Sequence, residues 1–172
     1  IDRNLLDVFS EIQDGKYQTE ILALRKNLGH SKELKQNLNC FMISGTFAGS
    51  KKQENLIKYS QIIHLDYDYL PIDQLSSIKT KASDISTTFA CFISPSGKGL
   101  KVFIRINTTY SEHQLMYQEI RSFYDDIIGF DSDNSCANIN RACFVSWDPE
   151  LFLNINSECF VQTEIAKSVH LK

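Results

Sequence analysis

Two aspartates, Asp66 and Asp68, end an apolar run in the segment "SQIIHLDYDYLP" (residues 60–71). The apolar residues before them predict a strand that enters a hydrophobic core. Because residues two apart on a strand face the same side, the two carboxylates should lie side by side, with His64 on the same face. Neighbouring carboxylates repel each other unless a cation lies between them, and Mg²⁺ prefers oxygen ligands of this kind. The spacing favours a divalent-metal site; a strand that runs into a polar turn before Pro71 gives the same pattern.

A second group of residues with phosphate-binding character surrounds a predicted hairpin turn. Two β-rich runs flank "PSGKG" (residues 95–99), which predicts a hairpin between residues 88 and 106. Serines, glycine amides and cations gather around this turn: Ser94, Ser96, Lys98, Lys101 and Arg105. Exposed N–H groups with nearby cations can cradle a phosphate. The P-loop spacing GxxxxGK[ST] is absent, and a glycine-rich hairpin tip with solvated lysines is the plain alternative. Together with the acidic pair, the turn suggests phosphate chemistry.

Helices and strands alternate around these motifs. Helical periodicity predicts helices at 4–13, 17–28, 72–84 and 112–128, the last opened by a capping box of Ser111 and Gln114 and closed by Gly129. One strand followed by a turn at Gly45 is expected within 39–47, and further strands are expected at 60–67, in both arms of the hairpin, at 142–146 and at 158–162. Because the best-marked connection is a hairpin, we expect an α+β fold, with a mixed or antiparallel sheet and helices packed on one face.

Composition limits the classes of function. The 172 residues, 42% hydrophobic and 23% charged, predict one soluble domain over residues 1–172, and the first residues resemble the middle of a helix, as in a piece of a longer protein. A formal net charge of −3 excludes a general nucleic-acid binder, so any anion site must be local. No apolar run reaches the ~20 residues that span a bilayer, and no secretory leader is visible. Five cysteines without a CxxC pair favour a reducing cytoplasm and no zinc site.

The order of the motifs resembles the archaeo-eukaryotic primase superfamily. It is most similar to primase-like domains that precede virulence-associated-E-type helicase modules in bacterial and mobile-element proteins. The stretches that carry the resemblance are "ISGTF" (43–47), "IIHLDYDYL" (62–70), "FISPSGKGLKVFIRI" (92–106) and "GFDSDNSCANINRACFVSWDPELFLN" (129–154). The resemblance implies an RRM-like palm sheet with an N-terminal helical or αβ unit, at the N-terminus of a longer replication protein.

The resemblance also implies a set of acidic site residues. Asp66 and Asp68 would be catalytic residues and the first two metal ligands. A third acid should follow the long helix, and Asp131 is the expected one. Asp148 is the alternative metal ligand, although its Asp-Pro turn also suits a structural role.

The substrate-binding residues implied by the resemblance are basic or small. Many members of the superfamily carry a Ser-x-His whose histidine contacts the nucleotide phosphates, and this chain has no histidine there. Lys101 is the nearest counterpart, with Ser96 and Lys98 beside it, and a lysine can hold a phosphate as a point charge. Arg141 would be a further triphosphate contact; an exposed or ion-paired arginine is the plain alternative.

The implied function is DNA primase or polymerase activity. Two Mg²⁺ or Mn²⁺ ions would support nucleotidyl transfer from an NTP or dNTP to a 3′-hydroxyl on a single-stranded DNA template. A helicase module in the same polypeptide or operon would be a partner, and no association with a membrane is expected. One alternative is a catalytically inactive domain that binds nucleotide or nucleic acid in a replication or mobile-element protein. Another is a haloacid-dehalogenase-like phosphatase, which requires a parallel sheet.

Overall fold

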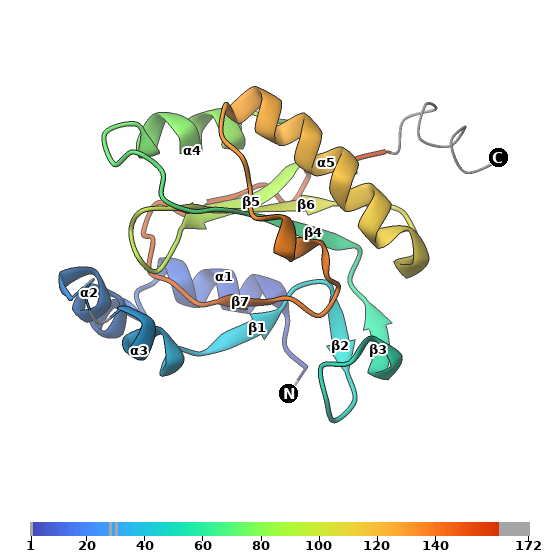
Figure 1. Cartoon of the computed structure of the whole chain (residues 1–172), viewed down its shortest axis with the longest axis horizontal. Helices are drawn as coiled ribbons and strands as arrows, with labels where there is room; N and C mark the ends of the chain where they lie inside the picture. The colour runs from blue at the N-terminus through green and yellow to red at the C-terminus, as the bar shows by residue number, and fades with distance from the viewer. Residues whose placement is uncertain (1, 28, 30, 162–172) are drawn as a thin grey trace.

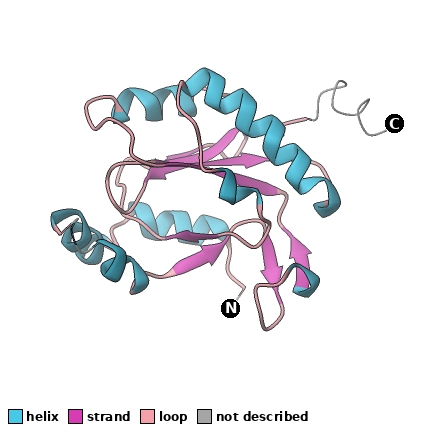
Figure 2. Cartoon of the chain, in the orientation of Figure 1, coloured by secondary structure: helices cyan, strands magenta, loops and turns pink. Residues whose placement is uncertain are grey.

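A four-stranded antiparallel sheet with the strand order β4-β6-β5-β8 forms the middle layer of the structure (Figures 1 and 2). The computed structural model describes residues 2–27, 29 and 31–161. The strands of this sheet are β4 (Ile62–Tyr67), β5 (Thr88–Ile93), β6 (Leu100–Arg105) and β8 (Phe152–Leu153). The predicted α+β class and the predicted hairpin are confirmed.

Helices α4 (Leu75–Ser83) and α5 (His113–Ile128) cover one face of this sheet (Figure 1). Helix α1 (Leu5–Gln13) and a two-stranded ladder of β1 (Cys40–Met42) and β7 (Ala142–Phe144) lie on the other face. The remaining elements are α2 (Gln18–Lys26), α3 (Ser31–Gln36), β2 (Gly45–Phe47), β3 (Leu56–Tyr59) and the short 3₁₀ turns η2 (Gln53–Asn55), η3 (Tyr110–Glu112) and η4 (Asn134–Ala137).

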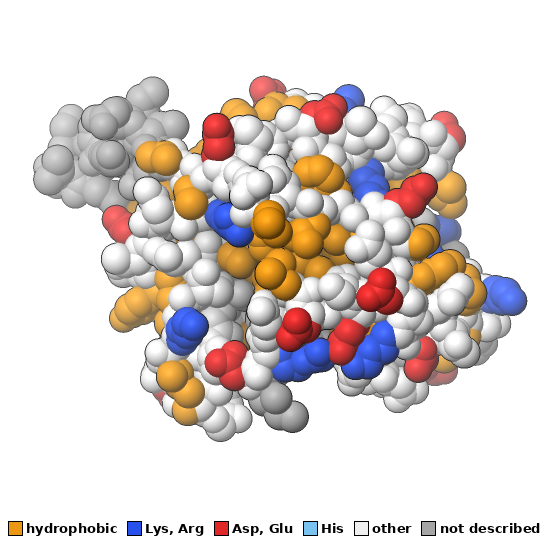
Figure 3. Space-filling view, turned by 180° about the vertical axis from the view of Figure 1, so that it is seen from behind, with side chains coloured by type: hydrophobic (Ala, Val, Ile, Leu, Met, Phe, Trp, Pro, Cys, Tyr) orange, Lys and Arg blue, Asp and Glu red, His pale blue; other side chains and the backbone are white. Residues whose placement is uncertain are grey.

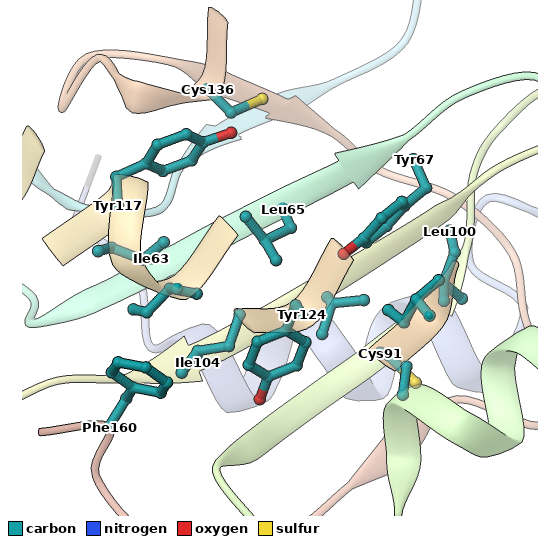
Figure 4. Packing of buried hydrophobic residues seen from close by; sticks show 14 of the residues in the cluster. Ile63, Leu65, Tyr67, Cys91, Leu100, Ile104, Tyr117, Tyr124, Cys136 and Phe160 are labelled. Atoms are coloured by element: carbon teal, nitrogen blue, oxygen red, sulfur yellow. The ribbon is translucent and has the colours of Figure 1, made fainter. Parts of the chain in front are cut away.

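The alternation of side chains along β4 divides its residues between two cores. Ile63, Leu65 and Tyr67 point toward the helical layer, where they pack with Tyr117 and Tyr124 of α5 (Figure 4). The intervening side chains point toward α1 and the β1–β7 ladder. This second core contains aromatic residues of the sheet and apolar residues of α1 and α2: Phe89, Phe92, Phe103, Val8, Phe9, Ile12 and Ile21. His64 and Asp66 therefore lie on the face that the N-terminal layer covers.

Two glycines shape the turn between β5 and β6. Gly97 has a φ of 71°, in the left-handed region that favours glycine. At Gly99 an added Cβ would lie 2.3 Å from the Tyr67 carbonyl oxygen and 3.0 Å from Ser94 Oγ. The end of β4 can therefore approach the hairpin closely only because position 99 has no side chain.

Several predicted elements need correction. The segment 39–47 is two strands, β1 and β2, which belong to different sheets. The capping box joins Thr109 and Glu112 at η3, because a 3₁₀ turn precedes α5. In place of the strand expected at 158–162, the described residues show an isolated parallel bridge between Ile106 and Phe160; residue 162, like residue 28 at the end of the predicted second helix, lies outside the described part. Elements α3, β3 and β8 were not predicted: α3 lacks apolar periodicity, and β3 and β8 are only four and two residues long.

The surface gives two negative findings for the described residues. None of their helices combines the length and the apolar character that crossing a bilayer requires. On the face shown in Figure 3, acidic and basic side chains are interspersed around a group of hydrophobic atoms. This face therefore offers no single-sign surface for a polyanion.

Candidate functional site

A cleft of about 320 Å³ lies where the ends of β4 and β6 meet the hairpin turn and the β1–β7 ladder. Its volume lies at the lower end of the range of small-molecule sites. Charged residues from four parts of the chain line it, together with small and apolar ones: Lys35, Asp66, Asp68, Lys101 and Arg141, then Ser94, Pro95, Ala142 and Phe144. The structure therefore brings together the acidic pair, Lys101 and Arg141.

Asp66 and Lys101 form an ion pair at the floor of the cleft. They are direct cross-strand partners on β4 and β6, and Lys101 Nζ donates to Asp66 Oδ2. The two residues are only 7% and 8% exposed. Asp66 Oδ1 is also buried and has no hydrogen-bond partner among the described residues. Since buried carboxylate oxygens are normally satisfied, this atom can accept a further ligand.

The electrostatics of the pair follow from burial and from nearby charges. Burial raises the pKa of Asp66, and Asp68 and Asp133 add to this effect, whereas Lys101 opposes it. Burial would lower the pKa of Lys101, but the charge of Asp66, its hydrogen bond and the charges of Cys143 and Asp68 together outweigh burial and raise that pKa. These surroundings favour the charged form of Lys101 in the floor of the cleft.

Asp68 differs from Asp66 in its surroundings. It follows the last residue of β4 and is exposed, yet it lines the same cleft and is close enough to raise the pKa of Asp66. The two carboxylates thus share a cleft, as expected, but one of them is already paired with a lysine. His64 lies further along the same face of β4, where it stacks against Phe103 and burial lowers its pKa to about 3.

Asp133 takes the position beside the pair that was expected for Asp131. Its N–H donates to the Asp66 carbonyl at 2.8 Å, and its carboxylate lies 3.3 Å from Arg141 Nη2. Burial opposes ionisation of Asp133, but hydrogen bonds from Ser135 and the charge of Arg141 lower its pKa. Asp133 therefore stays ionised and orients Arg141 at the edge of the cleft.

Asp131 and Asp148 lie outside the cleft. The Asp131 side chain is 93% exposed and lies 3.9 Å from Arg121 of α5, along a shallow surface depression. Asp148 is buried, accepts from Lys79 Nζ at 2.7 Å and from the Ile93 N–H at 2.8 Å. Asp131 is a solvated surface acid. Asp148 connects its turn to α4 and β5 through these two contacts. We include neither in the site.

The hairpin turn contributes differently from the sequence-based expectation. Ser94 and Pro95 line the cleft, whereas Ser96 and Lys98 are not part of its lining. The Gly97 N–H donates to the Ser94 carbonyl at 2.9 Å, and the Ser96 hydroxyl lies 3.1 Å from Ser94 Oγ. Because the turn uses the Gly97 amide for its own hydrogen bond, that amide is not free to bind an anion.

Sequence reasoning placed Ser94 at the phosphate-binding turn but missed Lys35 and Pro95 as cleft residues, and it missed Asp133 at the edge of the cleft. Asp133 had a visible signal, since "FDSD" offers a second acid two residues after Asp131. Lys35 had none, because it lies on the short helix α3, which carries no apolar periodicity.

The comparisons with known proteins give one match, to a family of domains. Residues 33–153 match the family model described as "BT4734-like, N-terminal domain". Searches of curated proteins and of solved structures gave no significant match. The matched region covers more than half of the chain and contains every residue that lines the cleft. The chain belongs to the BT4734-like N-terminal domain family.

Proposed function

We propose that this domain binds the triphosphate of a nucleotide in the cleft and catalyses metal-dependent nucleotidyl transfer of the primase–polymerase type. The observation that carries the proposal is the cleft itself, which joins two carboxylates to Lys101, Arg141 and Lys35. Three cations and two acids suit a ligand that carries both phosphate groups and a divalent metal.

The acidic residues fit a metal that arrives with its nucleotide. Asp66 Oδ1 is buried without a partner among the described residues, and Asp68 presents a second carboxylate to the same cleft. No group of three or more His, Cys, Asp or Glu side chains in the described part is arranged to hold a metal ion. Mg²⁺ in nucleotide sites is commonly held by one or two carboxylates plus phosphate oxygens and water, which matches this donor set.

Each side chain of the cleft then has a separate task. Asp66 and Asp68 would hold the metal, which when bound neutralises phosphate charge and activates the attacking 3′-hydroxyl. Lys101 adds a fixed positive charge in a site of low dielectric, where it acts more strongly than in water. Arg141, oriented by Asp133, has further N–H donors for phosphate oxygens. Positioning and electrostatics would supply most of the catalysis.

The second candidate function is a domain that binds nucleotide or nucleic acid without catalysis. The observation that favours it is the Lys101–Asp66 pair, because the lysine already compensates the charge that a catalytic metal would otherwise balance. The phosphatase alternative gains no support, since β4, β5 and β6 pair in antiparallel fashion. A single-stranded DNA template and a helicase module remain the partners that we propose for either function.

Incorporation of labelled nucleotide on primed and unprimed single-stranded DNA, with Mg²⁺ or Mn²⁺, tests the proposal. We expect incorporation by the wild type, none by the variant that combines Asp66→Asn with Asp68→Asn, and wild-type activity for Asp131→Asn. Nucleotide binding without incorporation would support the second candidate. A wild type that neither binds nor incorporates nucleotide would contradict both.

A further inference from the structure

A single guanidinium group, that of Arg25 on α2, is bonded to the hairpin turn that lines the cleft. Arg25 Nε donates to the Pro95 carbonyl and Nη2 to the Ser94 carbonyl, both at 3.3 Å. Nη2 also donates to the Trp147 carbonyl at 3.0 Å. One side chain thus connects two segments that are far apart in the sequence, and both segments belong to the matched family region.

The contact between Arg25 and the turn is close as well as polar. A Cβ added at Gly97 would lie 3.3 Å from Arg25 Cδ and Nε. The guanidinium carbon lies 6.0 Å from the centre of the Trp147 ring. The arginine is therefore packed against the turn, and the turn needs glycine at position 97 for this reason in addition to its positive φ.

Helix α2, which carries Arg25, is held in place by buried side chains and by the turn before it. Its side chains Ile21 and Leu24 are completely buried. The turn between α1 and α2 is held by Glu11, which accepts hydrogen bonds from Lys16 at 2.5 Å and from Tyr17 at 2.7 Å. Arg25 is thus presented by an anchored element, although α2 lies before the region that the family model matches.

The direction of these hydrogen bonds bears on anion binding. Carbonyl oxygens that point into a phosphate site repel the phosphate. The carbonyl oxygens of Ser94 and Pro95 instead accept hydrogen bonds from Arg25, which compensates their negative partial charge. We propose that Arg25 is a positioning residue that fixes the 94–97 turn as a wall of the phosphate cleft, so that the N-terminal α1–α2 unit is a functional part of the site. This inference rests on the proposed function for the ligand, but its effect on the turn can be measured without one.

The test compares Arg25→Gln and Arg25→Lys with the matched control Lys26→Ala, an exposed cation of the same helix. Amide hydrogen exchange at Gly97, whose N–H bonds to Ser94, reports the order of the turn. The affinity for a fluorescent ATP analogue with Mg²⁺ reports the cleft. Urea unfolding checks that each variant is folded. For Arg25→Gln we expect exchange at Gly97 to become about tenfold faster and binding about tenfold weaker. Arg25→Lys should show smaller changes, and Lys26→Ala none.

Each other outcome overturns the inference in a distinct way. Unchanged exchange in Arg25→Gln would mean that Arg25 does not fix the turn. Faster exchange with unchanged affinity would mean that the turn is fixed but is no part of the phosphate site. If the wild type binds no nucleotide, the proposed function fails, and faster exchange in Arg25→Gln would then leave Arg25 with a purely structural role.

Discussion

Asp66 and Lys101 lie opposite each other on β4 and β6 and form an ion pair that is almost withdrawn from solvent. Lys101 engages one oxygen of the carboxylate and leaves the other, Oδ1, buried without a partner among the described residues. A buried charge is costly, and each member of the pair lowers the cost of burying the other. The arrangement holds a fixed positive charge and a free carboxylate oxygen side by side in one cleft.

Breaking this pair should destabilise the fold. In Lys101→Met the buried Asp66 loses its partner, and we expect the free energy of unfolding at pH 7 to fall by about 3–5 kcal/mol. Urea unfolding measures the change. Combining Lys101→Met with Asp66→Asn removes both charges and should restore most of the loss. A single variant as stable as the wild type would show that the pair is not buried as described.

Gly99 should tolerate no side chain. In Gly99→Ala the new Cβ would clash with the Tyr67 carbonyl at 2.3 Å. Because Tyr67 ends β4 and Gly99 directly precedes β6, neither backbone can easily move aside. We therefore expect a loss of about 1–3 kcal/mol in the free energy of unfolding. Gly29→Ala is the control, since an added Cβ there meets nothing within 4 Å. Equal stability of the two variants would refute the close approach of β4 to the hairpin.

The fold was predictable from the sequence where local pattern decides it. The alternation from Leu100 to Ile106 and the helix that ends at Gly129 depend on near neighbours, so the hairpin and α5 were correctly predicted. The prediction for residues 39–47 was wrong because the chain changes sheet at Ser44. The Ser44 hydroxyl donates to the Ile62 carbonyl, so this change depends on a partner that is distant in the sequence. The boundary between β1 and β2 is therefore set by tertiary contacts.

The site residues, too, were predictable only where local pattern and strand register determine them. Asp66 and Lys101 are paired by the register of β4 and β6, and their residue types already pointed to phosphate chemistry. The choice between Asp131 and Asp133 depends on how the chain leaves α5, which no local pattern determines. Arg25 could not be found at all, because its contacts are with backbone carbonyls, which carry no residue-specific signal.

Acid should destabilise the protein through His113. Its Nδ1 lies 2.8 Å from Tyr59 Oη, and burial lowers its pKa from 6.5 to about 4. As the pH falls from 6.5 to 4, the unfolded chain binds a proton that the folded chain does not. The stability present above pH 6.5 is therefore lost by up to about 1.4 kcal/mol per pH unit.

Urea unfolding of the wild type and of His113→Gln at several pH values measures this dependence. The difference between the two proteins isolates His113, because buried His64 contributes to both. A pH dependence that is the same in both proteins would show that His113 is not held in its neutral form.

The two acids outside the cleft should behave in opposite ways. Asp148→Ala removes the partner of Lys79 and of the Ile93 N–H, and we expect a loss of about 3 kcal/mol in unfolding free energy. Asp131→Asn changes an exposed side chain and should alter stability by less than about 0.5 kcal/mol. Thermal denaturation of both variants tests these two expectations. An Asp148→Ala variant as stable as the wild type would show that Asp148 has no structural role.

The measurement that tests the central claim most directly is calorimetric titration with a non-hydrolysable dNTP analogue, with and without Mg²⁺. Asp68→Asn is the informative variant, because Asp68 is exposed and its replacement should leave the fold unchanged; Asp131→Asn is the matched control. We predict that Mg²⁺ strengthens binding to the wild type and to Asp131→Asn by about tenfold, and that Asp68→Asn loses most of this gain. Binding that does not depend on Mg²⁺ in the wild type, or an undiminished gain in Asp68→Asn, would contradict the account.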